Sequence, residues 1–358
     1  MNKVMVLTAV LAATAAHAVQ AQELAQEQAP APTQDASDPA TFCATDITPV
    51  IGLDYGSRYT DDSATRSDFD ETSDAEVTKQ LAPVDKMITF LSNIANIAAV
   101  PGPDQEQAAA CVLSRLHEWA ADYALSEIGT MNAKISVPSR IAGFAFAYRQ
   151  VEPFLPVSEE RTVVEAWLSK RSYETISFFD LEAPPKASRN NLRAWAAMSS
   201  ALVGISTDDP LLKRWAADST ELVACSAAED GSLPMEMGRG ALALHYQLHA
   251  VSALVVTAAL LDDQGFKLFD RCGGNIGKAV DFVVEGFADP AAVTALAGKE
   301  QSYFNGKEKL EGFEVAWAAA YLAKVDDPAV RKFVEPFGKL MNSKIGGDQA
   351  LIWPDKAS

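Results

Sequence analysis

The sequence LAPVDKMITFLSNIANIAAVPGPDQEQAAACVLSRLHEWAADYALSEI, residues 81–128, has apolar side chains three and four residues apart in both of its halves. The apolar positions of the two halves are Val84, Met87, Ile88, Leu91, Ile94, Ala95 and Ala98, and then Ala109, Val112, Leu113, Leu116, Trp119, Ala120 and Tyr123. Between them, Pro101-Gly102-Pro103 ends the first helix. The pattern predicts helices over 81–99 and 105–128 that pack as an antiparallel hairpin.

The rest of the chain continues this pattern, with polar breaks between helical segments and almost no β-type alternation. The further predicted helices span 140–151, 158–179, 191–204, 210–227, 238–262, 273–286 and 311–322. Successive helical hairpins predict an all-α protein, either a solenoid or a closed toroid, although the sequence has no clear repeat of fixed period.

The composition is that of a globular protein with an acidic surface. The chain has 358 residues, of which 48% are hydrophobic and 22% charged, so wholesale disorder and collagen-like fibres are excluded. Length alone leaves one or two domains open. The formal net charge of −18 repels nucleic acid and anionic membrane surfaces, so neither is an expected partner. We expect a monomer.

The first 41 residues predict an export signal followed by a tether. Lys3 precedes an apolar run and small residues up to Ala21, which is typical of a secretory signal peptide over 1–21. Residues 22–41 are rich in Ala, Gln, Pro and Asp, so we expect a disordered linker. The folded domain is then 42–358, and the location is periplasmic or secreted. Beyond the signal we find no apolar run of 18 residues, so no membrane anchor is expected.

The four cysteines, Cys43, Cys111, Cys225 and Cys272, all follow the signal. In an exported protein an even number of cysteines suggests disulfides, and four cysteines allow three connectivities. We favour Cys43–Cys111 and Cys225–Cys272, because each pair ties a loop or chain end to a neighbouring helix. The alternative is that some are buried free thiols. The spacing contains no C-x-x-C, which makes a structural zinc site improbable.

Polar chemistry concentrates in residues 230–249, which hold two of the histidines, His245 and His249. If one helix runs through Arg239, then Tyr246 lies seven residues on, close to two full turns, so that the guanidinium and the phenol share a face. His249 follows Tyr246 by three residues and shares that side. The alternative is that the tyrosine and histidines are interior polar residues and that Arg239 is a surface charge.

Two further polar clusters accompany this segment. One is Arg189-Asn190-Asn191-Leu192-Arg193-Ala194-Trp195, at the start of a predicted helix, where paired asparagines are also ordinary N-caps. The other is a loop that contains Ser57-Arg58-Tyr59 and Arg66, which taken singly is a solvated loop.

Together the three clusters resemble the alginate lyase family of the helical toroid type, polysaccharide lyase family 5, and its relatives that cut polyglucuronate. In that family an Asn-Asn-His motif is followed shortly by Trp. A Gly-x-Leu-Pro turn precedes an arginine, and a tyrosine follows that arginine by seven residues. Here Asn191, Arg239 and Tyr246 match these functional positions. The resemblance runs from about Cys43 to Tyr321 and implies an incomplete (α/α) toroid.

The sequence departs from the family pattern at two positions. Leu192 stands where the family has its histidine, and His249 stands where it has a second tyrosine. His249 or His245 could replace the lost function, and His249 is favoured because it shares the face of Tyr246.

The resemblance implies β-elimination on a β-1,4-linked polyuronate, which leaves a 4,5-unsaturated uronate end. Removing the C5 proton next to a carboxylate requires hydrogen-bond donors and positive charge, for which Arg239 and the Asn191 amide are suitable. Tyr246 is the expected base, and a neighbouring guanidinium favours that role. In mannuronate and glucuronate the C5 proton and O4 leave from the same side, so one tyrosine suffices. We therefore expect little action on guluronate.

A polyanionic substrate also needs a local basic cleft, since the protein as a whole is acidic. The expected cleft residues are Arg58, Arg66, Arg189, Arg193 and Arg239. Tyr59, Trp195 and Trp119 are candidates for stacking on sugar rings, with core packing as the alternative for the tryptophans. Asn190 is a further candidate for substrate binding, and Glu236 is a candidate for orienting Tyr246 or a histidine. No cofactor and no metal site are expected. The competing hypotheses are a non-catalytic polyuronate-binding protein and a toroid glycoside hydrolase with paired carboxylates.

Overall fold

The structure, a computed structural model, describes residues 42–354; the predicted signal (1–21) and linker (22–41) lie outside the described residues. The first hairpin consists of α1 (Glu71–Ala98) and α2 (Gln105–Ala121). Helix α1 begins ten residues before its predicted start, because Asp70 caps it by accepting a hydrogen bond from the backbone N–H of Ser73.

The predicted extension of the second helix to residue 128 is wrong. Helix α2 ends at Ala121 because Tyr123 and Leu125 adopt positive φ angles of 55° and 56°, which a right-handed helix excludes. Residues Glu127–Ile128 instead form β2, which pairs in parallel with β1 (Gly52–Leu53). This short ladder attaches the N-terminal segment to the hairpin.

The prediction of an all-α fold is confirmed. The other long helices are α3 (Met131–Val151), α4 (Glu159–Leu181), α5 (Asn191–Ser206), α6 (Pro210–Ala224), α8 (Ala243–Asp262) and α9 (Asn275–Ala288). The shorter ones are α7 (Pro234–Met237), α10 (Ala291–Ala297), α11 (Ala318–Leu322), α12 (Pro328–Val334) and α13 (Gln349–Ile352). Single 3₁₀ turns and the β3–β4 pair (Met341–Asn342 and Gly347–Asp348) complete the described residues.

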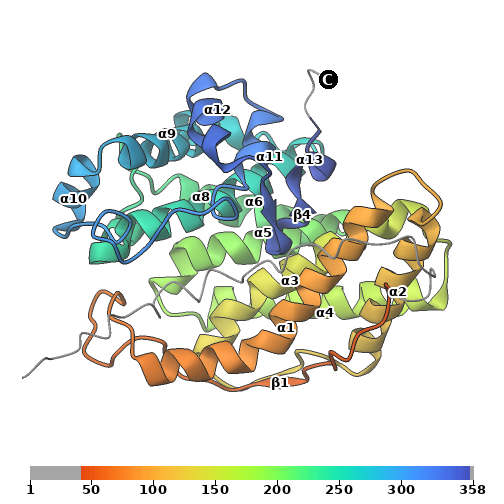
Figure 1. Cartoon of the computed structure of the whole chain (residues 1–358). Helices are drawn as coiled ribbons and strands as arrows, with labels where there is room; N and C mark the ends of the chain where they lie inside the picture. Colours follow the sequence, from red (N-terminus) through yellow and green to blue (C-terminus); the bar gives the residue numbers. More distant parts are fainter. Residues whose placement is uncertain (1–41, 355–358) are drawn as a thin grey trace, which may run out of the picture.

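The helices form two curved layers, as predicted for an incomplete (α/α) toroid. Inner helices α1, α3, α5, α8 and α11 each contact the next, and outer helices α2, α4, α6 and α9 do the same. The C-terminal segment, which includes the 3₁₀ turn η6 (Ser343–Ile345) and β4, packs on α1 and α3. Figure 1 shows this segment between the half built from α1–α4 and the half built from α8–α12.

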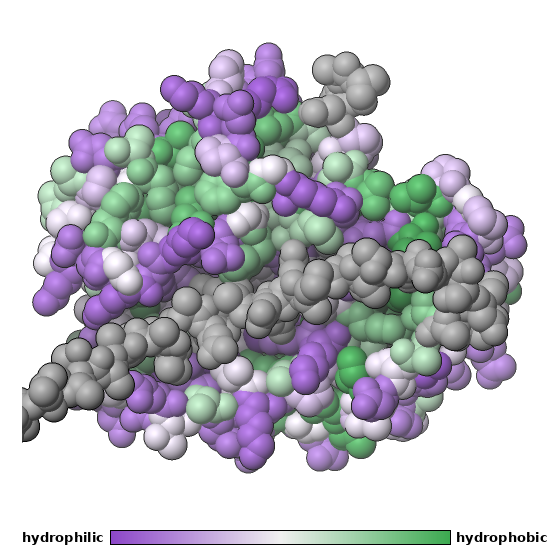
Figure 2. Space-filling view, viewed as in Figure 1, coloured by the Kyte–Doolittle hydropathy of each residue, from purple (hydrophilic) through white to green (hydrophobic). Residues whose placement is uncertain are grey.

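Helix α8 lies in the core, and it is apolar along most of its length. Among the described residues, Gly240–Asp262 is long and apolar enough to cross a membrane, but 89% of the window is buried inside the protein. The sequence analysis expected no apolar run of 18 residues beyond the signal, and this helix is an exception. Figure 2 shows hydrophobic residues over the α8–α9 region and hydrophilic residues at the α12 end.

Two predicted helices are shorter than expected. The helix expected over 238–262 begins at Ala243, because Gly240 has φ of 57° and heads a 3₁₀ turn, η3 (Gly240–Leu242). Of the helix expected over 311–322, only α11 is helical. The residues before α11 form turns, in which the Glu314 carboxylate accepts hydrogen bonds from the Glu311 backbone and the Tyr303 hydroxyl.

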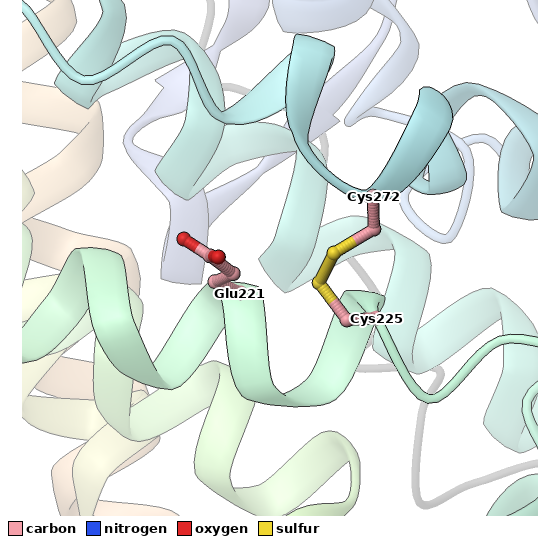
Figure 3. A group of neighbouring side chains, drawn as sticks. All are labelled: Glu221, Cys225 and Cys272. Atoms are coloured by element: carbon pink, nitrogen blue, oxygen red, sulfur yellow. A yellow bond between two sulfur atoms is a disulfide. The ribbon is translucent and has the colours of Figure 1, made fainter.

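Both predicted disulfides are present. Cys43–Cys111 ties the start of the described chain to α2, and Cys225–Cys272 ties the end of α6 to the segment before α9. Loops of this length correspond to about 4 kcal/mol of stabilisation each in the chain-entropy model. Glu221 lies beside the second pair, but Figure 3 shows the two sulfurs bonded to each other, so they are not thiolate ligands for a metal ion.

Candidate active site

Arg239 and Tyr246 lie against each other at the start of α8. The guanidinium carbon of Arg239 is 3.5 Å from the ring centroid of Tyr246 and 5.7 Å from that of Tyr59. The expectation that one helix carries both residues is wrong, because Arg239 precedes the η3 turn. The turn at Gly240 nevertheless brings the guanidinium back over the phenol, which is a cation–π geometry.

The loop predicted as a polar cluster closes over this pair. Arg239 donates from Nε to the carbonyl of Thr65 at 2.9 Å and from Nη2 to the carbonyl of Arg66 at 2.8 Å. The hydroxyls of Tyr59 and Tyr246 are hydrogen-bonded to each other. Arg66 contributes its backbone, while its exposed guanidinium donates to Ser57. We call Tyr59, Arg239 and Tyr246 the reactive cluster.

Tyr59 stays protonated in this pair of tyrosines. Burial and the neighbouring Tyr246 raise the pKa of Tyr59 well above its usual value. Either hydroxyl can donate in the hydrogen bond between the two tyrosines. Burial acts to lower the pKa of Arg239, but interaction with Tyr246 and Tyr59 raises it overall, so the guanidinium is permanently charged.

Asn191 is held by Glu236 at the start of α5. The backbone N–H of Asn191 donates to Glu236 Oε1 at 2.8 Å, and its side-chain Nδ2 donates to Oε2 at 2.9 Å. Both residues have 0% exposed surface. Burial raises the pKa of Glu236 to about 7, although the Asn191 hydrogen bonds and Arg239 oppose the shift. Glu236, the candidate for orienting Tyr246 or a histidine, directs its carboxylate to Asn191, which in turn lies beside His249. Asn190 is the N-cap, accepting from the N–H of Leu192.

His249 lies on the other side of Asn191. Its Nδ1 is 3.2 Å from Asn191 Oδ1, and its ring is 6.4 Å from that of Tyr246. Burial lowers the pKa of His249 well below its usual value, and the positive charges of His245, Lys344, Arg140 and Arg239 lower it further, so the ring is neutral. Part of the side chain remains exposed by surface area, so this burial is incomplete.

The tryptophans are core residues, as the alternative interpretation held. Trp195 is 5% exposed and stacks on His249 with centroids 4.8 Å apart, so it supports the histidine instead of contacting a sugar. Trp119 is 0% exposed. Leu192, at the position of the family histidine, packs against Phe178 and Phe179, on the side of α5 that faces α4.

His245 contacts residues 303–314, a segment that no sequence motif had pointed to. Its Nδ1 is 3.5 Å from Glu308 Oε1 and 3.4 Å from the hydroxyl of Tyr303, which donates to Glu314. Its ring is 5.0 Å from that of Tyr246. His245 therefore lies beside the reactive cluster but belongs to a different hydrogen-bond network from His249.

Four of the five arginines expected in a basic cleft lie outside the reactive cluster, Arg66 among them because its guanidinium donates to Ser57. Arg193 donates to Asp180 at 2.8 Å and to Ser219 at 3.0 Å, and it stacks on Trp215, so its charge is compensated behind α5. Arg189 lies in the turn η2 (Ala187–Arg189) directly before α5. Arg58 donates to Asp74 and Thr78 on α1.

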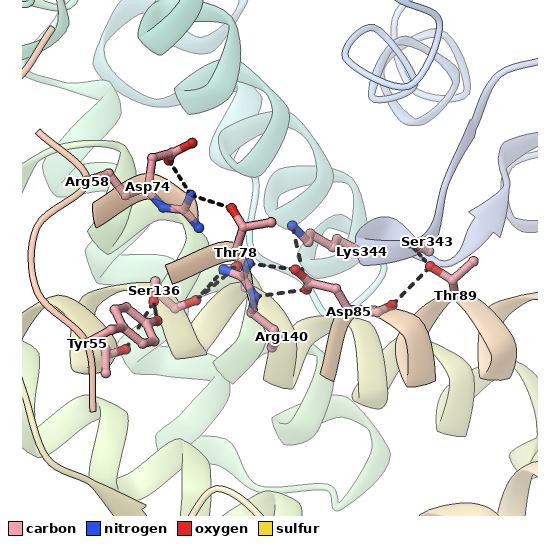
Figure 4. A network of polar contacts seen from close by, with 12 residues as sticks. Tyr55, Arg58, Asp74, Thr78, Asp85, Thr89, Ser136, Arg140, Ser343 and Lys344 are labelled. Atoms are coloured by element: carbon pink, nitrogen blue, oxygen red, sulfur yellow. Dashed lines mark hydrogen bonds and ion pairs between the residues drawn. The ribbon is translucent and has the colours of Figure 1, made fainter. Parts of the chain in front are cut away.

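A second group of cations, which sequence analysis missed, lies between α1, α3 and the C-terminal segment (Figure 4). Arg140 makes a two-pronged ion pair with Asp85, at 3.0 and 2.9 Å. The ammonium of Lys344 is 3.9 Å from the same carboxylate. Burial and the nearby Arg140 lower the pKa of Lys344 to about 8. We call Asp85, Arg140 and Lys344 the basic cluster; two cations there share one carboxylate.

Comparison with known proteins identifies the family. A family model described as alginate lyase matches residues 12–293. The chain belongs to the alginate lyase family. Its match to a polysaccharide lyase of Stenotrophomonas maltophilia is 28% identical and spans 68% of this chain and 72% of that protein. Its match to an alginate lyase of Cobetia marina is 26% identical and spans 68% and 66%.

Solved structures confirm the fold. Alginate lyase A1-III from Sphingomonas species A1 superposes with a TM-score of 0.71 at 22% identity, covering 87% of this chain and 86% of that one. A tyrosine-to-phenylalanine variant of A1-III complexed with a tetrasaccharide gives a TM-score of 0.75 at 21% identity, covering 90% and 88%. The predicted toroid and the predicted polysaccharide lyase family are therefore both confirmed.

Proposed function

We propose that this member of the family is an exported lyase that cleaves β-1,4-linked polyuronate, either polymannuronate or polyglucuronate, by syn β-elimination. The observation that carries the proposal is the guanidinium of Arg239 stacked 3.5 Å from the Tyr246 ring, with the hydroxyls of Tyr59 and Tyr246 hydrogen-bonded to each other. A phenol needs such partners to act as a base.

In the proposed step, the Tyr246 oxygen takes the C5 proton and delivers it to the departing O4. The C5–H and C4–O4 bonds break, a C4=C5 double bond forms, and no water is consumed. The charge of Arg239 lies over the phenol ring, where it stabilises negative charge on the oxygen. General acid–base catalysis of this kind contributes about 10²- to 10⁴-fold to a rate.

The substrate's carboxylates need positive charge, which the two clusters supply locally despite the net charge of −18. The influence of Arg140, Lys344 and Arg239 on the pKa of His249 supports this, since all three charges lie within electrostatic reach of that ring. A chain of uronates carries one carboxylate per sugar, so cations in two places suit a polymer better than a single sugar acid. Because Leu192 replaces the family histidine, we propose a preference for mannuronate or glucuronate over guluronate.

Export is part of the proposal. The two disulfides favour an oxidising compartment, in agreement with the predicted signal peptide. We also propose that the C-terminal segment, which carries Lys344, belongs to the same domain as α1 and α3, the helices that it contacts.

The decisive experiment incubates the purified mature protein, in the presence of a chelator, with polymannuronate, polyguluronate and polyglucuronate in separate reactions. The expected result is rising ultraviolet absorbance from the unsaturated uronate end with polymannuronate or with polyglucuronate. New reducing ends without ultraviolet absorbance would indicate a hydrolase. Binding without any product would indicate the non-catalytic alternative.

A further inference from the structure

The hydrogen bonds around Asn191 fix the direction of its side-chain amide. An ionised carboxylate only accepts hydrogen bonds, and Glu236 takes one from the Asn191 backbone and one from Nδ2. The oxygen Oδ1 must therefore point the other way, toward Nδ1 of His249, 3.2 Å away. Because Oδ1 only accepts, the proton between them belongs to His249 Nδ1.

The indole N–H of Trp195 has two acceptors within reach, and a proton on His249 Nδ1 would remove one of them. The N–H lies 3.0 Å from His249 Nδ1 and 3.1 Å from the carbonyl oxygen of His249. A protonated Nδ1 cannot accept, so the indole donates to the carbonyl instead. A neutral ring with its proton on Nδ1 presents an unprotonated Nε2.

We propose that Glu236 and Asn191 act as a hydrogen-bond relay that fixes the tautomer of His249. In this arrangement His249 Nε2, and not the buried Asn191 amide, contacts the sugar beside Tyr246. Glu236 and Asn191 are then positioning residues. The proposal rests on the proposed lyase function and deepens it, because it assigns a proton-accepting atom to the side of the site that lost the family histidine at Leu192.

Asn191 itself is poorly placed to contact a ligand. Its exposed fraction is 0%, and both heavy atoms of the amide already have partners. His249 retains some exposed surface and lies on the same helix as Tyr246, three residues on. The relay thus connects a fully buried carboxylate to the ring of a partly exposed histidine.

Protonation of Glu236 would reverse the relay. A carboxylic acid donates to Asn191 Oδ1, the amide turns over, and Nδ2 then donates to an unprotonated His249 Nδ1, which moves the ring proton to Nε2. The charged groups that face Glu236 are Arg239, which precedes η3, and His245 on α8. Those facing His249 are His245, Lys344 of the C-terminal segment, Arg140 of α3, and Arg239. These neighbours favour an ionised Glu236 and a neutral His249, whereas burial of Glu236 opposes its ionisation and raises its pKa to about 7.

The test is the protonation pattern of His249, measured by nitrogen NMR on the full mature protein labelled at histidine. Of the four histidines of the chain, His17 lies in the predicted signal, and a His249→Gln variant assigns the His249 signals in the mature protein. In the wild type above pH 7 we expect the proton on Nδ1. A proton on Nε2, or on both nitrogens, would overturn the proposal without any variant having to fold.

The variant Glu236→Gln provides the second arm, since it is almost isosteric. Its single side-chain oxygen accepts from the Asn191 backbone, so its NH₂ faces the Asn191 amide and forces the reversed arrangement. We expect the proton of His249 to move to Nε2, with kcat falling about 100-fold, more than KM changes. An unchanged tautomer in a folded Glu236→Gln protein would contradict the relay.

Glu308→Gln is the matched control, because it removes a buried carboxylate that faces His245 and not His249. It should alter the His245 signals and leave the His249 tautomer as in the wild type; a switched His249 tautomer would show that the effect is not specific to the relay. The NMR result is independent of turnover, so the relay and the lyase function can fail separately.

Discussion

The reactive cluster and the basic cluster both concentrate positive charge in an acidic protein, but they do so differently. In the reactive cluster, Arg239 donates to two backbone carbonyls and to the Tyr59 hydroxyl, and it lies over the phenol of Tyr246. In the basic cluster, Arg140 and Lys344 share the carboxylate of Asp85. The first arrangement suits proton transfer and the second suits binding. Substitutions in the first should therefore lower kcat, and those in the second should raise KM.

The largest expected effect is that of Tyr246→Phe. Removing the hydroxyl removes the only atom assigned to carry the proton from C5 to O4, so kcat should fall by about 10³-fold or more while the polymer still binds. Initial rates from the ultraviolet assay and binding by calorimetry measure the two quantities. Tyr123→Phe is the matched control, because Tyr123 is 69% exposed and lies after α2. A Tyr246→Phe protein with near-normal turnover would show that the reactive cluster has another role.

Arg239→Lys comes next in size. Lysine keeps the charge but lacks the planar group that stacks on Tyr246 and reaches the carbonyls of Thr65 and Arg66 together. We expect kcat/KM to fall about 100-fold, chiefly through kcat. Arg214→Lys serves as the control, since the Arg214 side chain is 69% exposed and pairs only with Asp218. If the two variants behaved alike, charge alone would account for Arg239.

The sequence predicted the layers of the fold because helical spacing is a local signal. The first hairpin shows the limit: apolar positions located α1 and α2, but the positive φ values at Tyr123 and Leu125 that end α2 have no glycine to announce them. The start of α8 is the opposite case. Gly240 marks the break there, but the apolar pattern that continues across it predicts one unbroken helix.

The site was predictable only where a motif places its residues. Arg239 and Tyr246 were found by spacing and resemblance, although the helical geometry assumed for them was wrong. The pairing of Asn191 with Glu236 joins residues 45 positions apart, and that of Lys344 with Asp85 joins the two ends of the domain. One signal for the basic cluster was present in the sequence. Asp85 lies on the apolar face of α1, where a charged side chain needs a buried partner.

Lys344→Met tests the binding side of the comparison. Losing one partly buried cation should raise KM for a polyuronate about tenfold and change kcat by less than about twofold, since Lys344 lies outside the reactive cluster. Lys339→Met is the control from the same segment, where the side chain is 63% exposed and pairs with Asp348. A drop in kcat without a change in KM would assign Lys344 to the chemistry and dissolve the distinction between the clusters.

The smallest expected effect is a pH dependence of KM that originates at Lys344. Because burial and Arg140 lower its pKa to about 8, the ammonium is charged below that pH and loses its proton above it. KM should therefore rise as pH increases through about 8, by at most the tenfold seen in Lys344→Met, while bound polyanion shifts the transition to higher pH. Lys344→Arg keeps its charge throughout this range, so its KM should stay flat. If KM rose equally in the wild type and in Lys344→Arg, the titrating group would lie elsewhere, and the basic cluster would bind substrate through Arg140 alone.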